Sequence, residues 1–163
     1  MNVIQLHRGQ IILRNITMRK EYKVTFSLLP TVFERGWHSI LQFTTGGSCC
    51  ERGWRIPAVW FHRSLGDLTA RSLHFASDVN GTGNHIFNTE KEYPINEWID
   101  ICIQQSKRAH GMYLFSIIVN REVVYQGMNL LPTIYNNVTV YAGNPWNESQ
   151  AGWIKGLEIS VGV

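Results

Sequence analysis

Apolar and polar residues alternate with a period of two along most of the chain. In residues 21–30, EYKVTFSLLP, the apolar side chains of Tyr22, Val24, Phe26 and Leu28 fall on one face and polar ones on the other. In WIDICIQ three isoleucines alternate with polar residues in the same way. Because successive side chains of a β-strand point to opposite faces, these runs predict strands with one buried face. Helical periodicity does not stand out, so we expect an all-β protein.

The predicted strands are short, rich in β-branched and aromatic residues, and bounded by Gly, Pro or Asn. They are EYKVTFSLLP, GWHSILQFTT, RIPAVWFH, SLHFAS, NHIFNT, EWIDICIQQ, YLFSIIVNREVVYQG, NVTVYAG and GWIKGLEISV. Strands with polar turns and no helices predict an antiparallel sandwich or barrel. Pro57 indicates an edge strand or a bulge. A hairpin is expected around Asn120–Arg121, although arginine is unusual in a two-residue turn.

Length and charge restrict the function classes. The chain has 163 residues, and we predict one domain spanning residues 1–163. Its formal net charge of +3 is small and is not gathered into a basic stripe, so nucleic acid is not an expected partner. No apolar stretch is long enough for a transmembrane helix. The N-terminal text does not read as a signal peptide, which leaves a leaderless chain and a removed signal both open. A homo-oligomer also stays open.

The cysteines and the glycosylation sequons bear on the compartment. The chain has three cysteines, the adjacent pair Cys49 and Cys50, and Cys102. Adjacent cysteines rarely bond each other, so we expect three free thiols, or a bond from one of the pair to Cys102. Four N-x-[ST] sequons begin at Asn15, Asn80, Asn137 and Asn147. They favour a secreted or cell-surface glycoprotein, although asparagine-rich turns would produce the same text.

The order of the segments resembles that of the concanavalin A-like lectin and glucanase superfamily of jelly rolls, which includes laminin G-like domains. The resemblance rests on RGQIILRNITMRKEYKVTFSLLPTVF, NEWIDICIQQ, FSIIVNREVVYQG and AGWIKGLEI, which together span nearly the whole chain. It implies a sandwich of two curved antiparallel sheets. It also implies a site for glycans or extracellular proteins on a loop rim or a concave face, although a fold does not fix a function.

Catalytic motifs of this and related folds are missing. The carboxylates of Glu90, Glu92, Glu97 and Asp100 lack the E-x-D-x-x-E spacing of glucanases, and no G-x-S-x-G nucleophile elbow occurs. The H-x-N-x-R and W-G-x-E-x-R runs of galectins are absent as well. We therefore expect a protein that is not an enzyme. A hydrolase with an unrecognised carboxylate pair is the least favoured class.

The segment DVNGTGN could bind calcium through Asp78, Asn80 and Asn84, which offer carboxylate and amide oxygens. Only one of these groups is charged, and a glycine-rich hairpin turn accounts for the text equally well. The hairpin turn is the preferred interpretation, with calcium and a ligand-binding rim as alternatives. No other cofactor is expected.

The six tryptophans suggest a ligand site, because sugar rings present apolar faces that stack on aromatic side chains. Trp37 and Trp98 lie in alternating runs and are expected to pack in the core or on a sheet. The candidate ligand-binding residues are Trp54, Arg55, Trp60, His62 and Asn80. These observations predict a non-enzymatic, extracellular carbohydrate-binding lectin. The alternative is a protein-interaction or adhesion module of a receptor or matrix protein, with an extracellular protein as its partner.

Overall fold

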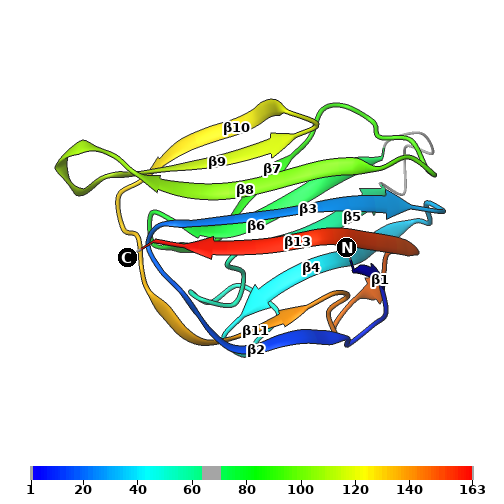
Figure 1. The fold of residues 1–163 in the computed structure, drawn as a ribbon, viewed down its shortest axis with the longest axis horizontal. Coiled ribbons are helices and arrows are strands. Elements are labelled where there is room, and N and C mark those ends of the chain that lie inside the picture. Colours follow the sequence, from blue (N-terminus) through cyan, green and yellow to red (C-terminus); the bar gives the residue numbers. More distant parts are fainter. Residues whose placement is uncertain (1, 64–70, 163) are drawn as a thin grey trace.

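The structure is a computed structural model that describes residues 2–63 and 71–162, and it contains two packed β-sheets (Figure 1). One sheet has six strands, in the spatial order β1 (Val3–Gln5), β13 (Gly152–Val161), β3 (Tyr22–Pro30), β8 (Ile99–Lys107), β9 (Tyr113–Val119) and β10 (Glu122–Asn129). The other has seven, in the order β2 (Ile11–Met18), β11 (Tyr135–Tyr141), β4 (Gly36–Thr44), β5 (Ala58–Arg63), β6 (Ser72–Val79) and β7 (Thr82–Asn88), with β12 (Glu148–Ser149) beside β4. A single 3₁₀ turn, Ala109–Gly111, is the only helical element of the described residues.

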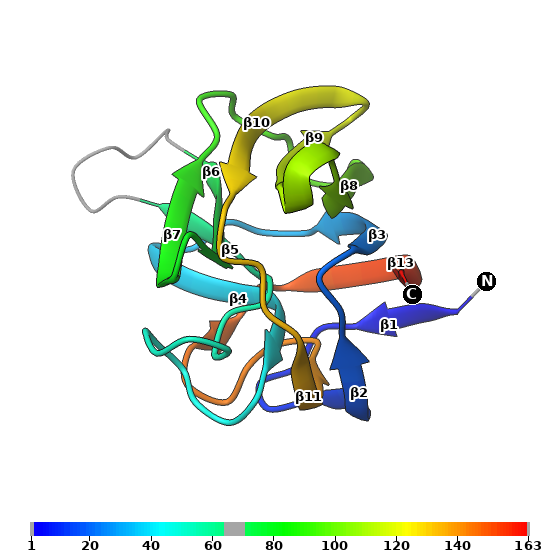
Figure 2. The ribbon, with the colours of Figure 1, turned by 90° about the vertical axis from the view of Figure 1, so that its left-hand side faces the viewer.

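Strand pairs within both sheets are antiparallel, except that β12 runs parallel to β4. Figure 2 shows the sheets as two layers, with β8, β9 and β10 in one and β5, β6 and β7 in the other. The antiparallel sandwich predicted from the sequence is confirmed. No helix of the described residues is long and apolar enough to cross a membrane.

Alternation along the strands places the core between the two sheets. On β3 the side chains of Tyr22, Val24, Phe26 and Leu28 are buried, as the sequence pattern predicted. On β8 the three isoleucines of IDICIQ are buried in the same cluster. The seven-stranded sheet contributes the opposite side of this core, largely through aromatic and branched side chains such as Phe43. The core therefore fixes which face of each strand is left for a site.

Two hairpins have two-residue turns with positive φ at both positions. Asn80 and Gly81 connect β6 to β7 with φ of 54° and 76°, and Asn120 and Arg121 connect β9 to β10 with φ of 50° and 66°. This conformation matches the right-handed twist of the paired strands. The preferred interpretation of DVNGTGN as a hairpin turn is confirmed. Arg121 occupies a position where glycine is usual, and its side chain is exposed.

The expectation of an edge strand at Pro57 is wrong, whereas the alternative of a bulge is confirmed. Pro57 lies immediately before β5, and β5 is an interior strand between β4 and β6. The amide of Ile56 donates to the carbonyl oxygen of Phe43 on β4 at 3.0 Å, and the amide of Phe43 donates to the carbonyl oxygen of Pro57 at 2.9 Å. Two residues therefore stand opposite one, as in a β-bulge, where a proline is tolerated.

The expected cysteine pairing is also wrong. Cys49 and Cys50 are bonded to each other, and Cys102 is free. The peptide bond between the adjacent cysteines is cis, and their Cα atoms are 3.1 Å apart. Cys102 lies on β8 of the six-stranded sheet, on the face that points away from the core.

Candidate functional site

The candidate site lies on the outer face of the seven-stranded sheet, over strands β4 to β7. On β5, Val59 and Phe61 belong to the core between the sheets, whereas Ala58 and Trp60 form a separate cluster with Ala76. Successive residues of a strand point to opposite faces, so Trp60 must lie outside the sandwich. Trp60 is nevertheless only 2% exposed. Other side chains must therefore cover this face of the sheet.

Cross-strand pairing assembles a row of rings beside Trp60. Trp37 on β4 lies opposite His62 on β5, and the two rings stack with centroids 3.9 Å apart. Trp60 lies opposite His74 on β6, and the His74 and Trp37 rings form a T-shaped pair with centroids 4.5 Å apart. Nδ1 of His74 lies 2.7 Å from Oδ1 of Asn88 on β7. Because an amide oxygen only accepts, this contact assigns the proton to Nδ1 in the neutral ring.

Arg55 crosses the pocket from the segment that precedes β5. Its guanidinium carbon lies 4.5 Å from the centre of the Trp60 ring. Nε donates to the carbonyl oxygen of Ser48 at 2.9 Å, and Nη1 donates to Oδ1 of Asn84 on β7 at 2.7 Å. The cation is thus held between an aromatic face and two neutral acceptors. Its position is fixed by a loop on one side of the sheet and by β7 on the other.

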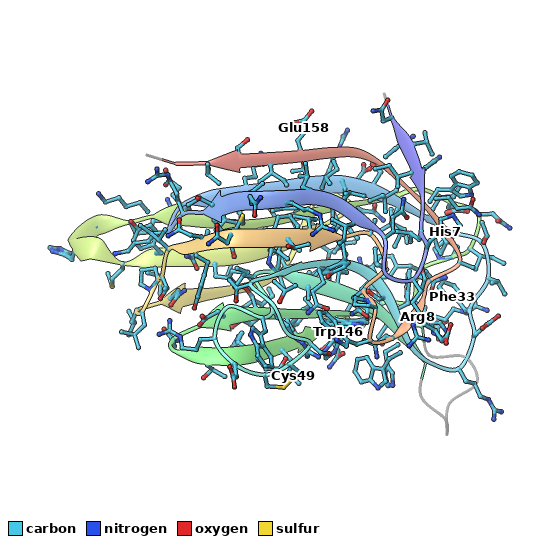
Figure 3. All side chains as sticks on the ribbon, turned by 90° about the horizontal axis from the view of Figure 1, so that it is seen from below. His7, Arg8, Phe33, Cys49, Trp146 and Glu158 are labelled. Atoms are coloured by element: carbon cyan, nitrogen blue, oxygen red, sulfur yellow. A yellow bond between two sulfur atoms is a disulfide. The ribbon has the colours of Figure 1, made fainter. Side chains whose placement is uncertain are left out.

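The loop of residues 142–150 forms another wall. Nε1 of Trp60 donates to Oδ1 of Asn147 at 3.1 Å. Asn144 is fully buried, and its Nδ2 donates to Oε1 of Gln42 at 2.7 Å, while its Oδ1 accepts from the amides of Trp146 and Asn147. In Figure 3 Trp146 and Cys49 lie on the side of the seven-stranded sheet, and Glu158 lies on the opposite side, on β13.

Gln42 joins this loop to the one that carries Arg55. Its Nε2 donates to the carbonyl oxygens of Trp54 at 2.8 Å and Ser48 at 3.1 Å. Gln42 and Asn144 both have no solvent exposure, and each of their side chains is satisfied by hydrogen bonds. Buried polar networks of this kind are rigid when every member has a partner. The two loops that border the site are therefore largely pre-formed.

Together these elements form the walls of a pocket of about 380 Å³ that is open to solvent. Its described lining residues are Trp37, Arg55, Trp60, His74, Asn84, Ile86 and Asn147. Small-molecule sites usually combine a largely apolar lining with a few convergent polar groups. Here the apolar part is mainly indole, and the polar part is one guanidinium, one imidazole and two carboxamides. This composition suits a flat polyhydroxylated ligand with one apolar face.

Burial lowers the pKa values of the basic groups around the pocket. The pKa of Arg55 is lowered by desolvation, and so is that of His62. The pKa of His74 is lowered from 6.5 chiefly by burial, and the charges of Arg55 and His62 add to this, while the hydrogen bond to Asn88 opposes it. The neutral imidazole is therefore the favoured form of His74 at neutral pH.

The structure brings together some of the ligand-binding residues predicted from the sequence. Arg55 and Trp60 line the pocket, and His62 stacks on its Trp37. Trp54 does not line the pocket, because its indole packs against Gly47 within the segment between β4 and β5. Asn80 lies in the β6–β7 turn, where its Oδ1 accepts from the amide of Leu130.

Other pocket residues were not predicted as ligand-binding. Trp37 was expected to pack in the core or on a sheet; it packs on the outer face of the sheet against His62, and it is 44% exposed at the pocket. Trp98 is 37% exposed on the other side of the molecule, with Nζ of Lys155 4.0 Å from the ring centre. A register shift on β4 between Ser39 and Leu41 changes which residues face outward. The sequence shows no sign of this shift, so alternation alone could not assign Trp37 to a face.

The candidate calcium residues each have a different protein partner. The carboxylate of Asp78 is buried and accepts hydrogen bonds from Arg52 and from the hydroxyl of Tyr135. Oδ1 of Asn80 accepts from Leu130, and Oδ1 of Asn84 accepts from Arg55. Burial, followed by the hydrogen bond to Asp78, raises the pKa of Tyr135 to about 12. Calcium binding by these residues stays a prediction.

No group of three or more His, Cys, Asp or Glu side chains that could hold a metal ion occurs within residues 2–63 and 71–162. The carboxylates considered for hydrolysis also lie away from the described lining of the pocket. One of them, Asp100, accepts a hydrogen bond from Ser27 at 2.6 Å on the six-stranded sheet. The described lining of the pocket presents hydrogen-bonding groups and aromatic faces to a ligand.

No protein-family model and no curated protein sequence matches this chain. Solved structures do match it. A heptameric SAP-like pentraxin from Limulus polyphemus has a TM-score of 0.59 at 14% identity, with 97% of this chain and 75% of that chain covered. Domain 4 of an extracellular arabinanase from Geobacillus stearothermophilus, in complex with arabinotriose, has a TM-score of 0.57 at 14% identity, covering 98% of this chain and 75% of that one.

An alginate lyase in complex with alginate tetrasaccharide has a TM-score of 0.58 at 11% identity, with 98% of this chain and 80% of that chain covered. Identities this low establish the fold alone. The chain has the concanavalin A-like fold, as the order of its segments suggested. This fold includes both carbohydrate-binding domains and enzymes.

Proposed function

We propose that this chain uses its concanavalin A-like fold to bind carbohydrate in the pocket over Trp60, without catalysing a reaction. The observation that carries the proposal is the pairing of exposed Trp37 with the convergent polar groups of Arg55, Asn84 and Asn147 around one pre-formed cavity. The neighbours that bind arabinotriose and alginate tetrasaccharide support a saccharide as the ligand class.

The proposed mechanism assigns separate roles to the side chains. The exposed face of Trp37 stacks on the apolar C–H face of a sugar ring, while buried Trp60 forms the floor. Asn84, Asn147 and Arg55 exchange hydrogen bonds with the hydroxyl groups of the sugar. The Gln42–Asn144 network holds both loops in place before binding. Pre-organisation limits the conformational entropy lost on binding, so a small contact area can give useful affinity.

We also infer that the protein acts outside the cell. Three of its sequon asparagines, Asn15, Asn80 and Asn137, are exposed, so each could carry a glycan without entering the core. The fourth, Asn147, lines the pocket, and a glycan there would lie at the proposed site. The neighbouring arabinanase is described as extracellular, which agrees with this inference.

Titration calorimetry of the purified chain with a panel of neutral and acidic tetrasaccharides, with calcium and again with a chelator, tests the proposal. Trp37→Ala should weaken binding of any positive sugar by about 10-fold, because it removes the stacking surface. Trp153→Ala is the matched control, since Trp153 is 36% exposed on β13 of the other sheet. Equal losses in the two variants would place the sugar elsewhere. A folded chain that binds no saccharide would favour the protein-interaction or adhesion module.

A polysaccharide lyase is the second candidate. Several neighbours are alginate lyases, and the pocket contains a histidine, an arginine and two asparagines, which are residue types that can move protons and bind carboxylates. Against this, His74 is only 5% exposed and is flanked by the rings of Trp37 and Trp60. Incubation with polyuronates, followed by ultraviolet absorbance of unsaturated products, distinguishes the two. Turnover that is lost in His74→Gln would replace the binding proposal with the lyase.

A further inference from the structure

Two arginines of the described chain form ion pairs with carboxylates, whereas Arg55 has no carboxylate partner among the described residues. Arg8 pairs with Glu148 at 2.9 Å, and Arg52 pairs with Asp78 at 3.2 Å. The acceptors of Arg55 are a backbone carbonyl and a carboxamide, both of them neutral. No ion pair between described residues includes Arg55. Among residues 2–63 and 71–162, this charge therefore has no counter-ion.

The lack of a carboxylate partner is unusual because Arg55 is partly removed from solvent. Its side chain is partly buried, and desolvation lowers its pKa. Buried charges in proteins are normally paired, because removing an ion from water is costly. The described lining of the pocket includes neither aspartate nor glutamate. An anion that enters this pocket would therefore meet one fixed positive charge and no fixed negative charge from its described lining.

The guanidinium also has donors left for a ligand. Nε and one hydrogen of Nη1 are taken by Ser48 and Asn84. Nη2 has no hydrogen-bond partner among the residues that the structure describes. The free hydrogens lie on Nη1 and Nη2, and two such parallel donors match the two oxygens of a carboxylate. The contact with the Trp60 ring helps to hold the guanidinium group of Arg55 in place.

We propose that the ligand is an acidic saccharide whose sugar carboxylate binds the Nη1–Nη2 edge of Arg55. This inference rests on the proposed carbohydrate function and adds the chemical class of the sugar. In the resulting complex Trp37 stacks on the ring that carries the carboxylate or on its neighbour, and the carboxylate neutralises the Arg55 charge. A neutral sugar leaves that charge uncompensated in a site from which it has displaced water.

The test compares each acidic sugar with its own uncharged form. Affinities are measured by calorimetry for the tetrasaccharides of galacturonate, mannuronate, guluronate and glucuronate, and for their methyl esters. κ-Carrageenan tetrasaccharide, which carries sulfate and no carboxylate, is a further probe, and mannotetraose is the neutral reference. Hydrogen bonds to charged groups contribute about 1.5–3 kcal/mol. For at least one uronate we therefore expect the free acid to bind about 10- to 100-fold more tightly than its ester.

Variants then locate the effect. Arg55→Gln should reduce the acid-to-ester affinity ratio to about 1, because it removes the charge and the fork. Asn84→Asp should also reduce it, since a carboxylate at the position 2.7 Å from Nη1 would supply an internal counter-ion while keeping the side-chain shape. Arg108→Gln is the control, because Arg108 is exposed in the turn that follows β8, away from the pocket. Thermal melting verifies that every variant is folded.

The outcomes separate the two proposals. Neutral sugars and esters that bind as well as the acids, with binding lost in Trp37→Ala, would overturn the acidic-sugar inference and leave the carbohydrate function in place. A preference for acids that survives Arg55→Gln would overturn the role of Arg55. Equal, Arg55-dependent binding of the sulfated sugar would overturn the choice of a carboxylate. A folded chain that binds none of the probes would overturn the carbohydrate function itself.

Discussion

Nε1 of Trp60 lies 3.1 Å from Oδ1 of Asn147, and this hydrogen bond joins β5 to a loop 87 residues further along the chain. Asn144 Nδ2 donates to the same oxygen at 3.2 Å. The indole and the loop thus share one acceptor at the edge of the pocket. The position of the pocket wall depends on this junction, so the residues that hold it should affect stability and ligand binding together.

Asn144→Ala should lower the free energy of unfolding by about 2–3 kcal/mol. The substitution leaves the buried Oε1 of Gln42 and two partly buried backbone amides without their present partners, and an unsatisfied buried group costs about 1–3 kcal/mol. Urea denaturation followed by tryptophan fluorescence measures the loss. The control is Asn136→Ala, which removes an exposed contact with Thr17 and should change stability by less than about 0.5 kcal/mol. Similar losses in both variants would mean that the network is not important for stability.

Stability should decrease as the pH falls below 6.5, partly because of His74. The unfolded chain protonates His74 near its ordinary pKa of 6.5, whereas burial keeps the folded form neutral to a lower pH. In that interval the unfolded state binds more protons, so the unfolding free energy falls as the pH is lowered. His74→Gln should make this dependence shallower, and His62, whose pKa is also lowered, should leave a residual slope.

Chemical denaturation at a series of pH values from about 7 to about 5 measures the slope. His110→Gln serves as the control, because His110 is exposed in the 3₁₀ turn. This variant controls for the replacement of an exposed histidine by glutamine. An unchanged slope in His74→Gln would show that His74 is protonated equally in the folded and unfolded states.

Tyr135 should give the opposite pH dependence in alkaline solution. Its pKa is raised from 10.0 to about 12, first by burial and then by Asp78. The unfolded chain loses this proton near pH 10.0 and the folded chain near pH 12, so stability is retained below 10.0 and lost as the pH rises between these values. Ultraviolet titration of the phenolate should show one late-ionising tyrosine fewer in Tyr135→Phe. In folded Asp78→Asn the ionisation of Tyr135 should move to lower pH, and an unmoved transition would exclude Asp78 as a cause.

Removing a side chain from one hairpin turn should raise the free energy of unfolding, and adding one to the other turn should lower it. Arg121→Gly should raise the unfolding free energy by about 0.5–1 kcal/mol, because φ of Arg121 is 66° and glycine adopts this conformation without steric cost. Gly81→Ala should lower it by about 1 kcal/mol, since φ is 76° and the added Cβ would lie 3.1 Å from Cδ1 of Leu131. Thermal unfolding of both variants checks the signs. A decrease in Arg121→Gly would mean that the arginine makes a compensating contact.

Much of the fold could be predicted from local patterns. Alternation on β3 and β8 correctly gave the buried faces of Tyr22 to Leu28 and of the three isoleucines, because a strand with one buried face must repeat every two residues. The positive φ of Asn80 and Gly81 follows from the same local chemistry, and the N-G text predicted the hairpin. The expectation of an edge strand at Pro57 was wrong, because the order of strands in a sheet is set by tertiary packing. The bond between Cys49 and Cys50 was missed, because it depends on a local backbone conformation that composition does not report.

The site was only partly predictable. That Trp60 and Phe61 must face opposite sides follows from the sequence, but which of the two lies in the core depends on where the second sheet packs. Trp37 reached the pocket through a register shift on β4, and Asn147 through a loop anchored by buried Asn144. The sequence by itself determined the all-β character, the buried faces of β3 and β8 and one tight turn, because these depend on neighbouring residues. Only the tertiary structure decided that Arg55 lies over Trp60 beside Asn84, with no carboxylate partner among the described residues, because that arrangement depends on contacts between strands and loops distant in sequence.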